Sequence, residues 1–395
     1  MKKLNLMALA AAAVALASCS QSDDIAGQSA ENITDGLVPI QLNVSNPYAA
    51  SMTRGTGVVG GLTDDDNIWK GEAVNIYMLK KGTMEYAYFT EGTADAIYND
   101  AKFDTPAEVD NTASGLAIAS DGSIKYYPPS GNFDFWGYRL DDCQRGQKIE
   151  TDESIVIPFT LDGSQDIMVG KAVPTADQQV SATQQVLDRA YSAYAARNGV
   201  QPDITFKHLL TRLTFQAQAK TSSVCDEEQG VYIDAVRVKT VADGELTVAY
   251  TDAAGISNYG QQIKFTGDSV YLYLKDRAIT SNAALPALQP VLPTWNTTDN
   301  EGDKVRIGES LMIPAGEKYE LLFYVHQSKP KTNGCTLERI DYELPYTLTT
   351  TADFQMGYSY NVLLTINGLE QINITATLEK WGDGGTISIN PEDDM

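Results

Sequence analysis

The sequence contains few of the residues from which catalytic and metal sites are usually built. Its 395 residues include two histidines and four cysteines. His208 and His326 lie far apart in the sequence, and strand-like apolar residues flank them. A place in or beside the core is therefore the favoured interpretation of both. Two histidines without a neighbouring acidic motif provide little material for a zinc hydrolase or a Ser-His-Asp enzyme.

Motifs for nucleotide and acyl chemistry are also lacking. No G-x-G-x-x-G follows a predicted strand, and neither a Walker loop nor a G-x-S-x-G occurs. A glycosidase needs only two carboxylates, but no combination of acidic and aromatic residues stands out. The aspartates at 64–66 lack the spacing and the glycine of a calcium loop, so a solvated acidic loop is favoured. We predict no enzyme activity, no cofactor and no metal.

Positive charge is scarce. Against 52 acidic residues there are only 29 lysines and arginines, which gives a net charge of −23. A body this negative repels nucleic acid at long range. Nucleic acid is therefore excluded as an expected partner.

The cysteines do not form a recognisable framework. Beyond Cys19, only Cys143, Cys225 and Cys335 remain, and they are widely spaced. An odd number without close spacing argues against a disulfide scaffold or a zinc site. One disulfide can form after export, and the sequence leaves open which two cysteines would pair.

The first 18 residues have the parts of a bacterial lipoprotein signal peptide. Lys2 and Lys3 precede the apolar run 4–16, and small residues then lead to Cys19. The apolar run is too short for a typical membrane-spanning helix. In such signals the cysteine is acylated and becomes the new N-terminus, so Cys19 is the predicted lipid anchor that holds the protein to a membrane.

A polar tether and a short strand come after the anchor. Residues 20–36 are small, polar and acidic, which is typical of a flexible linker. Ile40, Leu42 and Val44 then alternate with polar residues, which predicts a half-buried strand.

Arg54 is isolated in the segment "NPYAASMTRGTGVVGG". No other lysine or arginine lies between Lys3 and Lys70. Small residues and glycines around Arg54 predict a loop that a protease can reach. The Arg54–Gly55 bond is thus a single place for a trypsin-like enzyme to cut.

The remainder is predicted to be mainly β. Strand-like segments recur about every ten residues, with short turns such as Lys81–Gly82 and Asp243–Gly244. One segment, 175–197, has helical spacing and is the one notable helix expected. This pattern favours β-sandwiches over a doubly wound sheet. We place the first domain at 55–203 and the second at 204–395, after an anchor and propeptide at 19–54.

Several segments together resemble the fimbrillin-like family, the subunits of type V pili on anaerobic Gram-negative bacteria of the gut and mouth. These segments are the lipoprotein front, "MTRGT", "QDIMVGKA", "FKHLLTRLTF" and "FQMGYSYNVLLTINGLEQINITATLEKWGDGG". The resemblance implies two tandem β-sandwich domains of the transthyretin-like, Greek-key kind. It also implies export as a lipoprotein to the cell surface.

The resemblance further implies a role in a fimbrium that serves cell adhesion. An Arg-specific or trypsin-like protease would cut after Arg54 and release the anchor with the strand of Ile40, Leu42 and Val44. An apolar groove would remain, and a strand from another pilus subunit would fill it by donor-strand exchange.

The donor strand and the place in the pilus stay open. Ile387 and Ile389 alternate as a donor strand should, but Pro391 and the acidic end leave it short. A stalk subunit is slightly favoured over a tip subunit that accepts but does not donate a strand. A permanently anchored base subunit is less favoured, because Arg54 offers a cut.

Two further alternatives belong to other functional classes of protein. One is a monomeric surface lipoprotein that binds a glycan through residues such as Trp136, Trp295 or Trp381, although packing is the favoured role of these tryptophans. The other is a β-sandwich enzyme with paired carboxylates. A glycan or protein receptor on a host or bacterial surface remains an expected partner.

Overall fold

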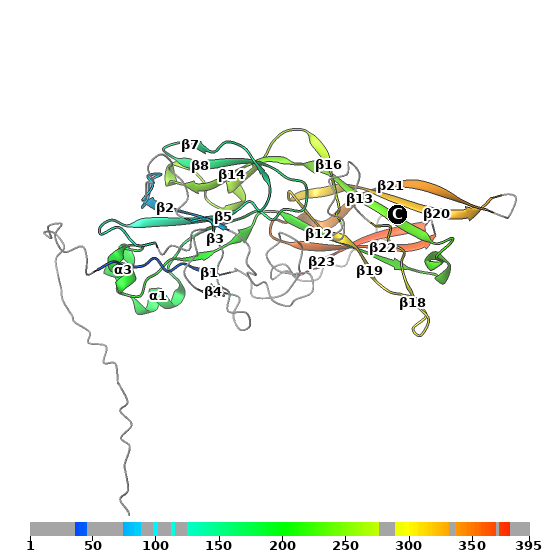
Figure 1. Cartoon of the computed structure of the whole chain (residues 1–395), viewed down its shortest axis with the longest axis horizontal. Helices are drawn as coiled ribbons and strands as arrows, with labels where there is room; N and C mark the ends of the chain where they lie inside the picture. Colours follow the sequence, from blue (N-terminus) through cyan, green and yellow to red (C-terminus); the bar gives the residue numbers. More distant parts are fainter. Residues whose placement is uncertain are drawn as a thin grey trace, which may run out of the picture. The chain divides into compact units, whose positions relative to one another are not determined.

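The protein is mainly β, as the sequence predicts (Figure 1). The computed structural model describes residues 36–45, 74–87, 98–101, 112–114, 125–275, 289–331, 336–368 and 371–379. Most of these residues lie in β-strands, and all but two of the described strand pairs are antiparallel.

The N-terminal part of the chain contributes two sheets. The larger has the strand order β11-β9-β5-β2-β3 and the smaller has the order β10-β1-β4. The strands of the larger sheet are β2 (Val74–Lys80), β3 (Tyr98–Ala101), β5 (Phe133–Arg139), β9 (Met168–Lys171) and β11 (Lys207–His208). Those of the smaller sheet are β1 (Asn43–Ser45), β4 (Thr112–Ser114) and β10 (Asp203–Thr205).

Two four-stranded sheets are built from the C-terminal part of the chain. Their orders are β19-β12-β22-β23 and β16-β13-β20-β21. The first contains β12 (Thr211–Ala219), β19 (Val305–Ile313), β22 (Ser359–Gly368) and β23 (Gln371–Glu379). The second contains β13 (Val231–Val241), β16 (Ser269–Tyr273), β20 (Gly316–Pro330) and β21 (Leu337–Phe354).

The two C-terminal sheets form a sandwich around one core. Along β20 the residues Tyr319, Leu321, Phe323 and Val325 are buried, and the residues between them are more exposed. Phe323 meets Phe215 of β12 edge-to-face, with ring centroids 6.4 Å apart. Alternate side chains of β20 therefore pack against the facing sheet, as sandwich packing requires.

The smaller elements complete the described chain. A further sheet has the order β15-β14-β8-β6, with β7 also paired to β8, and β17 pairs with β18. These strands are β6 (Gln144–Arg145), β7 (Ile149–Glu150), β8 (Ser154–Thr160), β14 (Asp243–Tyr250), β15 (Ile263–Phe265), β17 (Trp295–Asn296) and β18 (Glu301–Gly302). Short 3₁₀ helices are η2 (Ser222–Cys225), η3 (Asp252–Ala254) and η4 (Tyr259–Gln262).

The hairpin expected at Lys81–Gly82 is confirmed. After β2 the chain turns, and Leu79 forms a bridge with Tyr86. The backbone N–H of Lys80 donates to the carbonyl of Glu85 at 2.8 Å, and that of Ala87 donates to the carbonyl of Met78 at 2.9 Å. Gly82 has a φ of 73°, a left-handed conformation that glycine adopts without strain.

The helical segment expected near 175–197 is present, but it is not one continuous helix. The segment folds into three short helices, α1 (Ala176–Ser181), α2 (Gln184–Asp188) and α3 (Ala193–Arg197). The backbone of Tyr191 exchanges hydrogen bonds with Phe133 of β5, and the Tyr191 ring packs edge-on against Phe135. Ser192 then caps α3 by accepting from the N–H of Ala195. These contacts with β5 end the helix before Tyr191.

The hairpin expected around Asp243–Gly244 is also wrong. β13 pairs with β16 and β20, whereas β14 pairs with β8 and β15, so the chain changes sheets between β13 and β14. At Gly244 a Cβ atom would lie 2.5 Å from the ring of Phe159. The glycine is therefore needed for close packing on β8 rather than for a tight turn.

The predicted boundary between the two domains, between residues 203 and 204, falls within β10. β14 comes after this division in the sequence, and its partner β8 precedes it. The domain boundary stays a prediction.

Leu246 of β14 tests how much the pairing of β14 with β8 contributes to the stability of the protein. Its side chain is fully buried. We expect Leu246→Ala to lower the free energy of unfolding by about 2–5 kcal/mol, because the truncation leaves a cavity. The measurement is urea unfolding followed by tryptophan fluorescence.

Leu337→Ala is the matched control, because Leu337 is 42% exposed. We expect the control to change the free energy of unfolding by less than about 0.5 kcal/mol. Equal losses in the two variants would contradict a specific contribution of β14.

Candidate functional site

The segment before β1 is the first described part of the chain that packs into the core. Val38, Ile40 and Leu42 are buried, and Gln41 between them is exposed. The alternation predicted from the sequence is therefore confirmed for Ile40 and Leu42. Ile40 and Leu42 belong to a cluster that also holds Phe135. Regular strand geometry is confined to β1 itself.

This segment is hydrogen-bonded on both sides. On one side the N–H of Ile40 donates to the carbonyl of Lys125, and the carbonyl of Val38 accepts from Tyr127, both at 2.9 Å. On the other side the N–H of Gln41 donates to the side chain of Gln201. β1 continues the arrangement, antiparallel to β4 and parallel to β10. The segment 38–45 thus fills a place between two other parts of the chain.

The other residues assigned to processing and assembly lie outside the described residues. They are Cys19, Arg54, Gly55, Ile387 and Ile389, together with Cys335 and Trp381. Their roles stay predictions. The backbone of Val44 pairs with Ile204 and Ala113 within β1.

His208 is part of a buried group of polar side chains. Its Nδ1 lies 3.0 Å from a carboxylate oxygen of Asp166, and neither side chain is more than 3% exposed. A pair this buried is stabilised by its mutual contact, because each member has lost its hydration. Asp166 lies in the segment "QDIMVGKA", but the sequence alone gives no sign that it contacts His208.

Asp141 lies next to this pair. Its Oδ1 accepts a hydrogen bond from Nη2 of the buried Arg139 at 2.7 Å. Burial raises the pKa of Asp141 to about 7; Asp142 and Asp166 add to the rise, and Arg139 opposes it. Burial also raises the pKa of the nearby Cys143 thiol, which keeps this cysteine in its unreactive, protonated form.

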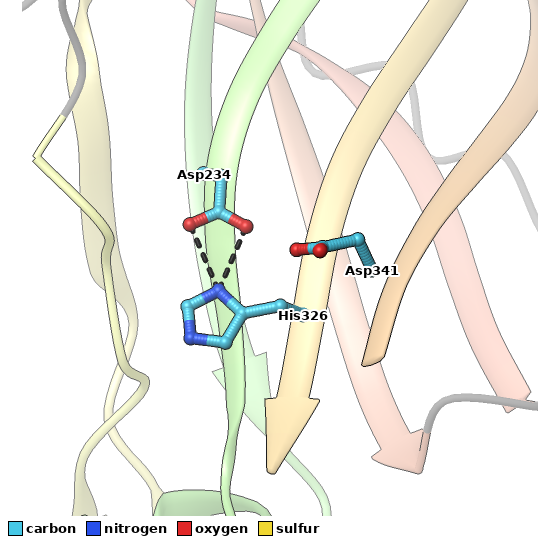
Figure 2. A group of neighbouring side chains, drawn as sticks. All are labelled: Asp234, His326 and Asp341. Atoms are coloured by element: carbon cyan, nitrogen blue, oxygen red, sulfur yellow. Dashed lines mark hydrogen bonds and ion pairs between the residues drawn. The ribbon is translucent and has the colours of Figure 1, made fainter. Parts of the chain in front are cut away.

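His326 lies in a second cluster, with Asp234 of β13 and Asp341 of β21 (Figure 2). Nδ1 of His326 is 2.8 Å and 2.7 Å from the two carboxylate oxygens of Asp234. The ring of Tyr232 stacks on the imidazole, with centroids 4.8 Å apart. The register of β13 against β20 shifts between Ile233 and Ala235, and this bulge places Asp234 beside His326.

The three side chains offer ligand atoms within 4.8 Å of one another. However, Arg339 already neutralises the carboxylates: its Nη2 is 3.1 Å from Asp234, and its Nε is 2.6 Å from Asp341. A metal ion would have to displace this guanidinium and break the hydrogen bond of His326 to Asp234. The geometry is that of a charged hydrogen-bond network, so we assign no metal to it.

A pocket of about 710 Å³ adjoins this network. Asp234, Arg339 and Asp341 form part of its lining. The other lining residues are Ala235, Arg237, Tyr273, Tyr324, Val325, Tyr342 and Glu343. No local pattern in the sequence indicates this pocket, because its residues come from four strands spread over 110 positions of the chain (234 to 343).

Comparison with known proteins assigns the chain to a family. Residues 53–381 match the sequence model of the family described as fimbrillin-like. The chain belongs to the fimbrillin-like family. The resemblance predicted from the sequence is confirmed, and the match covers most of the chain. No curated protein sequence is significantly similar to it.

Several solved structures are similar to this fimbrillin-like protein over most of their length. A candidate cell adhesion protein from Bacteroides uniformis is 15% identical, with a TM-score of 0.44, and the alignment covers 88% of this chain and 99% of that one. The fimbrial anchor protein Mfa2 from Porphyromonas gingivalis is 11% identical, with a TM-score of 0.33 and coverage of 89% and 100%. A fimbrial assembly protein from Parabacteroides distasonis is 10% identical, with a TM-score of 0.33 and coverage of 89% and 99%.

Helices in the described part of the fimbrillin-like chain are all too short, or too polar, to cross a bilayer.

The raised pKa of Asp141 predicts a pH-dependent stability. The folded state holds the Asp141 proton up to a pH of about 7, whereas the ordinary value is 3.8. The free energy of unfolding contributed by this group therefore falls as the pH rises between these values. Asparagine resembles the protonated carboxyl of Asp141. We therefore expect Asp141→Asn to remove the loss of stability that ionisation of this carboxyl causes as the pH rises.

The measurement is urea unfolding of both proteins at about pH 5 and about pH 8. The variant should gain stability relative to the original chain at the higher pH. Asparagine tolerates the φ of 49° at this position, so backbone strain does not obscure the comparison. Parallel pH profiles would contradict the prediction.

Proposed function

We propose that this fimbrillin-like protein is a structural subunit of a bacterial surface pilus that serves cell adhesion. The chain is exported as a lipoprotein with its anchor at Cys19, is cut after Arg54, and polymerises by donor-strand exchange. Its partners are other pilus subunits, an Arg-specific or trypsin-like protease, and the outer-membrane lipid before cleavage.

The position of segment 38–45 carries this proposal. The segment lies between Lys125–Tyr127 and β4 on one side and Gln201 and β10 on the other. Arg54 comes only a few residues after it. A cut there would separate the segment covalently from the body to which it is hydrogen-bonded.

The binding energy of segment 38–45 is suited to a segment that another strand can replace. Burial of Val38, Ile40 and Leu42 contributes about 1.5–3 kcal/mol for each side chain. Before cleavage the segment is tethered, so its effective local concentration is high. After cleavage it binds as a separate peptide, and once it has dissociated it is diluted. A strand from a neighbouring subunit can then take its place.

Loss of the segment would expose two strand edges and an apolar floor. Unpaired edges of this kind bind an added strand through backbone hydrogen bonds. Because the accepting groove and the donated strand are different surfaces, each added subunit leaves a new groove or donor free. Such a contact produces an open filament rather than a closed ring.

Arg54 provides the direct test of the proposal. We expect limited trypsin treatment of the purified full chain to cut after Arg54 and to yield ladders of oligomers on SDS gels. Arg54→Ala should abolish both the cut and the ladder. Arg54→Lys is the matched control, because trypsin accepts lysine and should restore both.

The released fragment and the oligomers are measured together by mass spectrometry and SDS gels. If the chain is cut completely at Arg54 and the product stays monomeric, the proposed polymerisation is contradicted.

Leu42 tests whether departure of segment 38–45 controls assembly. We expect Leu42→Ala to destabilise the uncut protein by about 2–5 kcal/mol, because Leu42 is fully buried. After trypsin cleavage the same variant should assemble faster than the original chain, because its resident strand binds more weakly. Unchanged or slower assembly, measured by light scattering after cleavage, would argue against strand exchange.

A further inference from the structure

We infer that the pocket on the outer face of β13, β20 and β21 binds a neutral saccharide. The inference goes beyond assembly of a pilus, because it concerns a ligand held by the uncut, monomeric chain.

The strand register places most of the pocket side chains on one face of the sheet; the exceptions are Val325 and Tyr342, which are opposite each other and face the core. In antiparallel pairs, directly opposed residues point to the same side. Arg237 is opposite Tyr273 on β16, and Ala235 is opposite Tyr324 on β20. Tyr324 is in turn opposite Glu343 on β21. Because Phe323 points into the core, Tyr324 and its partners face away from the core.

Three tyrosine rings on this face, those of Tyr271, Tyr273 and Tyr324, contact the guanidinium of Arg237. The guanidinium carbon of Arg237 is 4.2 Å from the ring centre of Tyr271 and 5.0 Å from that of Tyr324. Nη1 of Arg237 also donates to the hydroxyl of Tyr273 at 3.2 Å. Such cation–π contacts fix the rings and reduce the entropy that binding would cost. Fixed, partly exposed rings are suited to contact with the C–H face of a sugar.

The pocket also contains hydrogen-bond acceptors and donors. Within the described part of the chain, the exposed carboxylate of Glu343 makes no ion pair or hydrogen bond. Asp341, 67% exposed, has one oxygen in contact with Arg339. Arg339 and the tyrosine hydroxyls supply donors. Sugar hydroxyls both donate and accept, so they match a lining of this mixed kind.

The charge balance selects a neutral ligand. The lining has three carboxylates, Asp234, Asp341 and Glu343, and two guanidiniums, Arg237 and Arg339. The chain as a whole has a net charge of −23, which repels anions at long range. The two guanidiniums offset two of the three carboxylates, so the lining adds little net attraction for a cation. A volume of about 710 Å³ lies in the range of small-ligand pockets and accommodates a short oligosaccharide.

The test uses the purified, uncut full chain with three neutral probes, lactose, maltotriose and mannotriose, and one acidic probe, sialyllactose. Binding is measured by saturation-transfer NMR and titration. We expect at least one neutral probe to bind with a Kd of about 1 mM or below. We expect Tyr324→Ala and Glu343→Gln each to weaken that binding about tenfold or more.

Tyr259→Ala is the matched control, since Tyr259 is 36% exposed and lies in η4, outside the pocket lining. It should leave binding unchanged. Glu343→Gln removes only a charge at an exposed position, so it decides the question if Tyr324→Ala does not fold. Binding of no neutral probe, binding of sialyllactose alone, or neutral binding that survives Glu343→Gln would overturn the inference.

Failure of this test is distinguishable from failure of the proposed pilus function. Saccharide binding is measured on the uncut monomer, whereas the proposed function is tested by the formation of oligomers after cleavage at Arg54.

Discussion

A chain segment that lies between two neighbours must satisfy backbone hydrogen bonds on both sides and bury its apolar side chains. In this fimbrillin-like protein, segment 38–45 meets both requirements, although it comes from the very start of the described chain. β4 and β10, its partners, are otherwise far apart in the sequence. Ile40 and Leu42 also complete the cluster around Phe135. Removal of this segment therefore changes both a sheet and a core.

The few cations of this acidic chain organise its buried and half-buried polar groups. Arg139 contacts Asp141 in the core, and Arg339 joins Asp234 to Asp341 beside His326. Arg237 instead lies among tyrosine rings. In each case a planar guanidinium holds several partners in a fixed arrangement, which an ammonium group does less well. The same network that neutralises the carboxylates near His326 also shapes the wall of the pocket.

The proposed assembly and ligand sites use different physical properties. Assembly depends on the backbone, because any strand with suitable alternation can pair with the exposed edges. Ligand binding depends on side chains that four strands of the second half bring together. No residue of segment 38–45 lines the pocket. Mutations at one site should therefore leave the chemistry of the other unchanged, which allows the two functions to be studied separately.

Local patterns predicted several features correctly, because the sequence itself contains the information. The alternation of Ile40 and Leu42 predicted which side chains are buried, and Lys81–Gly82 predicted a hairpin, since a short turn needs only its own residues. The spacing of 175–197 is helical, yet contacts of Tyr191 with β5 divide the segment. Asp243–Gly244 has the composition of a turn, but close packing on Phe159 decided the course of the chain.

The sequence by itself determined that the chain is mainly β, that it belongs to the fimbrillin-like family, and that the segment around Ile40 and Leu42 is amphipathic. Only the tertiary structure decided which strands are neighbours, and therefore which polar side chains meet. His326 meets Asp234 because β13 has a bulge between Ile233 and Ala235, and Arg237 meets Tyr324 because β13 and β20 are paired beyond that bulge. Such contacts depend on pairing between distant segments, and no local pattern records that pairing.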